Sequence, residues 1–214
     1  MDEDISQINT STRNEKIVSF FANNKKKIVI IFFILLFILL GYFFYQEVNK
    51  RNKIKISDQY NNSKINYYLG NKENIENTMI EIIKAKDKSY SPLALYFLLD
   101  NNIINSKDKI NNLFDLVINE ISHDKEIKNL NIYKKALYNS ENDSESNLLK
   151  ILNPVINSDS VWKSHALYLM AEYFYSKNEK QKSKEFFNQI VNLENANQEI
   201  KLESQRRLNR DLSE

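Results

Sequence analysis

The longest apolar stretch of the chain runs from Ile28 to Tyr45 and contains no charged side chain. As a helix it would rise about 27 Å, at roughly 1.5 Å per residue, close to the ~30 Å hydrocarbon core of a bilayer. A buried helix of a soluble protein is the alternative, but such helices usually keep a polar stripe and this one has none. We therefore expect a transmembrane helix over residues 28–45, a tail over 1–27 and one domain over 46–214.

Apolar residues recur at helical spacing along the rest of the chain. The chain has only two glycines and two prolines, whereas β-rich folds need many more turn residues. The pattern therefore predicts an all-α domain. Its expected helices span 46–69 (ending at Gly70), 72–85, 91–104 (Ser91 as the N-cap, Pro92 at the first position), 107–121, 125–139, 144–153 (stopped by Pro154), 160–177, 179–193 and 197–213.

These helices form antiparallel pairs with a period near ~36 residues, which is typical of helical repeats. Small Ala171 and Ser183 would let the two helices of the pair in 164–197 approach closely, and Phe187 would fill the groove between them. Segments 91–124 and 129–155 fit the same template less well. We expect a tetratricopeptide-like helical-hairpin solenoid; the alternative is an irregular helical bundle, because many repeat positions carry unexpected residues. In 164–197 the template positions are Leu167, Met170, Ala171, Phe174, Asn178, Ser183, Phe187 and Ile190.

The tail before the span has a short amphipathic pattern. Thr12 and Glu15 have the spacing of a capping box. After them, Ile17, Val18, Phe20 and Phe21 are spaced to share one helix face. This predicts a short helix lying on the membrane surface, and a simple hydrophilic lead-in is the alternative.

The flanks of the apolar stretch bear on its role and direction. Many residues precede it and no Ala-x-Ala-like site follows it, so we expect an anchor rather than a cleaved signal peptide. Basic residues are equally numerous on both flanks, so the positive-inside rule alone gives no orientation. Lys25, Lys26 and Lys27 abut the apolar stretch, whereas Lys50 stands further away, which favours a cytosolic N-terminus.

Charge and composition argue against several functions. The net charge is +2 and is nearly balanced after the span, so no general attraction for nucleic acid is expected. The chain has no cysteine, and neither His123 nor His165 has partners at metal-ligand spacing. With two glycines it can form neither a Gly-rich phosphate loop nor a Gly-x-Ser-x-Gly elbow. We expect a non-enzymatic protein with no catalytic, metal or cofactor site.

Binding of protein is the function that helical repeats favour, because the first helix of each pair lines a concave surface. Tyrosines there would suit peptide recognition, since they offer apolar area and a hydroxyl at little entropic cost. The alternative is that these tyrosines simply pack between repeats. The repeat register places these candidate groove residues on the surface: Leu95, Leu99, Asn102, Tyr133, Leu137, Tyr168, Glu172 and Tyr175.

Several segments together resemble one known family. The chain starts with the acidic Asp2–Asp4, and Val18–Lys25 leads into the span with a Phe-Phe-x-x-Asn-x-Lys pattern; helical pairs then extend to Arg206. This arrangement is similar to the ancillary subunit of the bacterial Sec translocon, whose soluble part is a tetratricopeptide-like domain. The resemblance implies a single-pass inner-membrane protein with a cytosolic N-terminus and a periplasmic domain. Its implied partners are translocon subunits, a periplasmic chaperone and emerging polypeptides.

A second function would use the same architecture. An envelope scaffold, such as a cell-division or cell-wall coordinator, would bind one fixed protein partner through its repeats. The first hypothesis predicts many unrelated clients, and the second predicts a single stoichiometric partner.

Overall fold

The computed structural model describes the backbone of residues 2–213 and the side chains of residues 15–16 and 18–213. Within these residues the chain is all-helical and has no strand, as the sequence predicts. It divides into two compact units, Met1–Lys55 and Ile56–Glu214. The finer predicted boundaries, 1–27, 28–45 and 46–214, stay a prediction.

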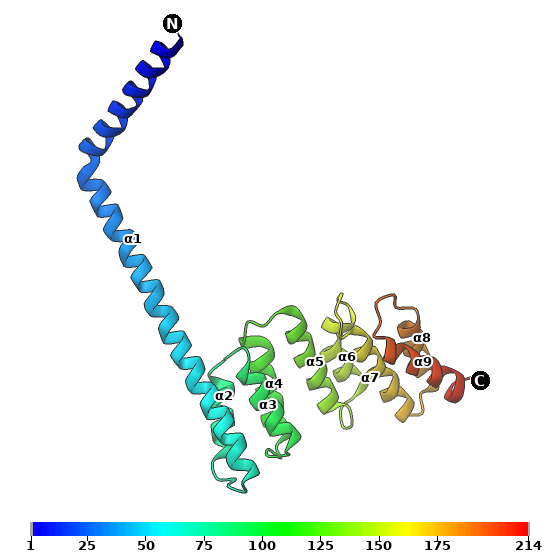
Figure 1. Cartoon of the computed structure of the whole chain (residues 1–214). Helices are drawn as coiled ribbons and strands as arrows, with labels where there is room; N and C mark the ends of the chain where they lie inside the picture. The colour runs from blue at the N-terminus through cyan, green and yellow to red at the C-terminus, as the bar shows by residue number, and fades with distance from the viewer. Residues whose placement is uncertain (1, 214) are drawn as a thin grey trace. The chain divides into compact units, whose positions relative to one another are not determined.

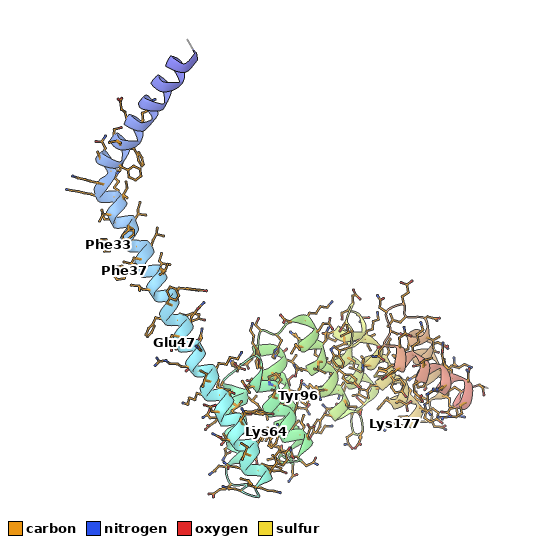
Figure 2. All side chains as sticks on the ribbon, viewed as in Figure 1. Phe33, Phe37, Glu47, Lys64, Tyr96 and Lys177 are labelled. Atoms are coloured by element: carbon orange, nitrogen blue, oxygen red, sulfur yellow. The ribbon has the colours of Figure 1, made fainter. Side chains whose placement is uncertain are left out.

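The first helix, α1 (Asp2–Tyr68), contains the apolar stretch. Within the described residues, its part Val18–Tyr68 is the one helix long and apolar enough to cross a membrane, and none of its most apolar window is buried. Phe33 and Phe37 project from the ribbon with no other element of the first unit beside them (Figure 2). A buried core helix, the alternative considered for this stretch, does not fit this exposure.

The predicted helix start at Thr12 is wrong, because α1 already begins at Asp2. No glycine or proline interrupts the sequence before Gly41. The helical hydrogen bonds of the backbone can therefore continue through Thr12. The side chains of Thr12 and Ile17, to which the capping and amphipathic predictions partly refer, lie outside the described residues. Val18, Phe20 and Phe21, the rest of the predicted apolar face, are all exposed.

The second unit begins with the last turns of α1 and continues through helices that contact one another in chain order. Figure 1 shows α3 to α7 following one another across this unit. After α1, the helices are α2 (Ile75–Lys84), α3 (Tyr90–Asp100), α4 (Lys107–Glu120), α5 (Lys125–Asn139), α6 (Glu145–Ile156), α7 (Lys163–Ser176), α8 (Lys180–Val191) and α9 (Gln198–Asp211).

Gly70 ends α1 as predicted. Its φ of 88° lies in the left-handed region that glycine adopts without strain. The N–H of Gly70 donates to the Tyr67 carbonyl at 3.1 Å, and that of Asn71 donates to the Asn66 carbonyl at 2.9 Å. This pattern satisfies carbonyls at the helix end. Asn102 and Asn178 take the same left-handed conformation after α3 and α7, where a glycine would be usual.

The predicted N-cap at Ser91, with Pro92 as the first helical residue, is wrong by two residues, because α3 begins at Tyr90 with Ser89 as its N-cap. The carboxylate of Asp87 accepts hydrogen bonds from the backbone N–H groups of Ser89 and Tyr90 at 2.9 and 2.8 Å, which caps the helix earlier. Ser91 is fully buried instead, and its hydroxyl donates to the Ile82 carbonyl at 2.9 Å.

The predicted stop of α6 at Pro154 is also wrong, because α6 continues to Ile156 with Pro154 inside it. A proline removes the N–H that would bond the carbonyl four residues earlier, here that of Lys150. Leu152 and Val155, on either side of it, are completely buried in the core. This burial holds the last turn in place despite the missing hydrogen bond.

The core of the second unit confirms the close approach predicted for α7 and α8. Ala171, Ser183 and Phe187 have no exposed surface, and Ala171 and Phe187 belong to one apolar cluster with Leu167 and Ile190. Small residues at Ala171 and Ser183 leave room for the Phe187 ring between the helices. A larger cluster extends from Tyr60 of α1 to Phe174 of α7.

Seven of the polar contacts between helices or the loops beside them have a nearly constant sequence separation. Each of these links a residue to one 33 to 37 positions away, which brackets the period predicted from the sequence. The repetition means that each hairpin presents the same region to its neighbour. These hydrogen bonds connect Ser57 with Tyr90, Glu76 with Lys109, Tyr96 with Asn131, Lys107 with Asp143, Glu126 with Ser160, Glu145 with Lys182, and Glu172 with Arg207.

Candidate functional site

The two histidines occupy packed positions. The His165 ring contacts the aromatic rings of Trp162 and Tyr133, at centroid distances of 4.9 and 5.8 Å. Burial lowers the pKa of His165, and burial together with the charge of Lys88 lowers the pKa of His123. Both rings are therefore neutral at neutral pH. Within the described residues, no three side chains converge as metal ligands.

Of the groove residues predicted in and just after α3, Leu95 is not at the surface. Leu95 has no exposed surface, because its side of α3 faces the core. Leu99 is half-buried against the same core, and Asn102 is exposed just beyond the helix end. Besides Leu99, the accessible residues of α3 include Leu93 and Tyr96.

The predicted groove residues of α5 are divided between packing and exposure. Tyr133 stacks on Trp162 with ring centroids 6.0 Å apart and ring planes 20° apart. Leu137 is 47% exposed. Tyr133 thus joins α5 to the start of α7, as in the alternative in which the tyrosines pack between repeats.

The predicted groove residues of α7 are brought together around Arg207 of α9. The Arg207 guanidinium donates to both carboxylate oxygens of Glu172, at 2.8 and 2.9 Å. It also lies 4.2 Å from the centre of the Tyr175 ring. Tyr168 packs edge-on against Phe187, and burial together with the Glu172 carboxylate raises the pKa of Tyr168 to about 12. These side chains join α7 to its neighbours α8 and α9.

An apolar hollow of about 430 Å³, the α3–α5 hollow, lies on the accessible faces of α3 and α5. Leu93 and Ile127, one on each helix, are both 42% exposed at this hollow. The sequence analysis missed this surface because it assigned the groove from the repeat register. Which apolar residues stay outside the core is visible only in the structure. Its apolar and aromatic lining is Pro92, Leu93, Tyr96, Ile127 and Leu130.

Tyr96, which is labelled in Figure 2, is one of the residues that line this hollow. Its hydroxyl donates to the side-chain oxygen of Asn131 at 2.7 Å, and the Lys134 ammonium lies 4.3 Å from its ring centre. Burial raises the pKa of Tyr96, so the hydroxyl stays protonated and keeps donating. A ring held in this way offers a rigid apolar wall to a bound side chain.

A second and larger hollow of about 840 Å³, the α4–α6 groove, lies between α4 and α6 with α5 beneath it. Its lining alternates polar and apolar groups. The polar groups include Asn111, Asp115 and Lys135, and the apolar ones are the isoleucines of the three helices and Pro154. The sequence analysis expected a groove lined by the first helix of each pair. It did not point to this surface, because residues of second helices line it as well.

No protein family, curated protein or solved structure gives a significant match to the chain. The candidate functional features are therefore the geometric ones: an exposed apolar helix in the first unit, and two hollows in the second.

Proposed function

We propose that this chain is a membrane-anchored protein-interaction module without enzymatic activity. The observation that carries the proposal is that no residue is buried in the most apolar window of Val18–Tyr68. The α3–α5 hollow supports the binding part, because hollows lined by apolar and aromatic side chains with a few polar groups are typical of binding sites.

The magnitude of the exposed apolar surface argues for a membrane. Sixteen large apolar side chains between Val29 and Tyr45 are exposed in the described part of the chain. Burying each would stabilise by about 1.5–3 kcal/mol, so together they amount to tens of kcal/mol. That exceeds the free energy of unfolding of a typical domain, which is ~5–15 kcal/mol. Lipid hydrocarbon is the environment whose thickness suits an apolar helix of this length.

The finer part of the proposal places the chain beside the Sec translocon, with its N-terminus in the cytosol and its second unit in the periplasm. The support is the resemblance carried by Val18–Lys25, the span and the helical pairs. In this location a tether confines the binding surface to the place where polypeptides emerge, and the high effective concentration lets weak binding suffice. Partners would be translocon subunits, a periplasmic chaperone and emerging chains.

A reporter enzyme fused after Glu214 tests the orientation. A reporter that is active only outside the cytosol should be active, and the same reporter fused at the N-terminus should not. Activity of only the N-terminal fusion would reverse the orientation and with it the translocon proposal.

Site-directed photocrosslinking in intact cells tests the binding surface and separates the two candidate functions. A photoreactive side chain at Leu93 should capture many secreted polypeptides and translocon subunits. The same group at Leu202, which is 53% exposed on α9 away from the hollow, is the matched control. A single stoichiometric partner at Leu93 would favour an envelope scaffold, and equal capture at both positions would remove the α3–α5 hollow as the site.

A further inference from the structure

The α4–α6 groove has one wall whose polar groups are already paired. Asn111 of α4 and Asn139 of α5 exchange reciprocal side-chain hydrogen bonds at 3.1 and 2.8 Å. Lys135 pairs with Asp115 at 2.6 Å. These contacts attach α5 to α4 in antiparallel orientation and leave this side of the groove with little unsatisfied capacity for hydrogen bonding.

The side of the groove formed by the start of α5 and by α6 is different, because its two lysines are unpaired among the described residues. Lys128 and Lys150 line the groove, are exposed, and make no ion pair within the part of the chain that the structure describes. This side therefore offers two cations.

The charges of the groove leave an excess of positive charge at this end. Lys107 and Asp143 pair at 2.8 Å, in addition to Lys135 and Asp115. Asp108, the remaining acid, lies in the first turn of α4, where the helix dipole stabilises a negative charge. Lys128, by contrast, follows closely on the start of α5, where the dipole adds to its positive potential.

The floor and length of the groove suit an extended chain. Ile118, Ile132 and Ile151 line the groove from three different helices; Ile151 is half-buried, and Ile118 and Ile132 are only 7% and 6% exposed at its floor. The lining of α4 runs from Asp108 to Asn119, which is about 16 Å at roughly 1.5 Å per residue. At ~3.3 Å per extended residue this length accommodates about five residues.

We propose that the α4–α6 groove binds an extended acidic segment of another polypeptide, with carboxylates paired to Lys128 and Lys150 and alternate apolar side chains on the isoleucine floor. This surface is separate from the α3–α5 hollow, and its binding does not depend on whether the chain is tethered beside a translocon.

Fluorescence anisotropy with the full chain in lipid nanodiscs tests the proposal. The probe is a labelled peptide of alternating aspartate and leucine, and the comparison probe has lysine in place of aspartate. The acidic peptide should bind the unaltered chain and the lysine peptide should not. In the Lys128→Glu/Lys150→Glu variant, affinity for the acidic peptide should fall at least about tenfold, because both charge pairs become repulsive.

The matched control is the Lys72→Glu/Lys84→Glu variant, which makes the same charge change at exposed positions outside the groove. It should bind the acidic peptide almost as the unaltered chain does. Equal loss in both double variants, equal binding of both peptides, or no binding of the acidic peptide would overturn the proposal.

The absence of cysteine allows the site to be mapped as well. An acidic peptide carrying a thiol-reactive group should label the Asn119→Cys variant at the groove faster than an Asn192→Cys variant at the end of α8. Equal labelling rates would place the peptide elsewhere. Concentration-dependent self-association that Lys128→Glu/Lys150→Glu abolishes would instead assign the groove to a second copy of this chain and overturn the peptide proposal.

Discussion

At the scale of single residues, two buried serines show how hydrogen bonding decides the effect of one hydroxyl. Ser91 and Ser183 both have no exposed surface. The Ser91 hydroxyl donates to a carbonyl, whereas the Ser183 hydroxyl has no partner within the described residues. An unpaired buried hydroxyl is destabilising by about 1–3 kcal/mol, and a satisfied one contributes about 0.5–1.5 kcal/mol.

Replacing each serine by alanine should therefore have opposite effects. Ser183→Ala should leave the free energy of unfolding unchanged or raise it by about 1 kcal/mol, and Ser91→Ala should lower it by about 0.5–1.5 kcal/mol. Urea unfolding of the full chain in detergent, followed by the fluorescence of the single tryptophan Trp162, measures both. A loss in Ser183→Ala as large as that in Ser91→Ala would show that the Ser183 hydroxyl is satisfied after all.

The histidines predict how stability depends on pH. Burial lowers the folded-state pKa of both His123 and His165, whereas the unfolded chain keeps the ordinary value of about 6.5. Between these values the unfolded chain binds more protons, so stability is greatest above about pH 6.5 and falls as the pH drops through this window. NMR titration of the two imidazole signals should give midpoints below about 6.5. A midpoint at or above that value would contradict the burial of that ring.

At the scale of elements, the attachment of α9 depends on one side chain. The Arg207 side chain is 13% exposed and pairs with Glu172 and Asp211. Its neighbour Arg206 is 73% exposed and pairs only with Glu203. A partly desolvated arginine with two partners stabilises its helix far more than an exposed pair does.

Arg207→Ala should consequently lower the free energy of unfolding by about 1–3 kcal/mol, since it leaves two carboxylates without their partner. Arg206→Ala, the matched control, should change it by less than about 0.5 kcal/mol. Hydrogen exchange across α9 gives a direct measurement, because its amides should exchange faster only in Arg207→Ala. Equal exchange in both variants would mean that apolar contacts alone hold α9.

Helix boundaries show where sequence patterns are sufficient. α5 was predicted with its observed ends, and Gly70 ends α1 because a left-handed residue is required there. Ser91 and Pro154 were assigned boundary roles that they do not have. In both cases the tertiary contacts of buried residues outweigh the local preference, which a pattern read along the chain does not include.

At the scale of the whole molecule, the proposed tether makes a prediction about membrane attachment. Each lysine at the centre of a spanning helix raises the free energy of membrane insertion by about 2.5–3.5 kcal/mol. The Leu36→Lys/Phe37→Lys variant should therefore be released from membranes by alkaline carbonate. The Gln46→Lys/Val48→Lys variant adds the same charge beyond the apolar stretch and should stay in the pellet. Equal retention of both variants would contradict a transmembrane role for this stretch.

The amino-acid sequence was sufficient for the all-helical class of this protein and for its long apolar helix. Three local properties of the sequence were enough: the apolar stretch Ile28–Tyr45, the near absence of glycine and proline, and the helical spacing of apolar residues. The structure has helices in the corresponding segments. The period near ~36 residues was also visible, because each hairpin repeats the same spacing of apolar positions.

The binding surfaces were decided only by the tertiary structure. Successive residues of a helix point about 100° apart, so a register wrong by one residue assigns a side chain to the wrong face. Leu95 was assigned to the surface in this way, whereas it lies in the core. Tyr168, Glu172 and Tyr175 became part of an interface because Arg207, 35 residues beyond Glu172, reaches back to them. Which faces remain open depends on what neighbouring hairpins cover, and that is a property of contacts between segments distant in the chain.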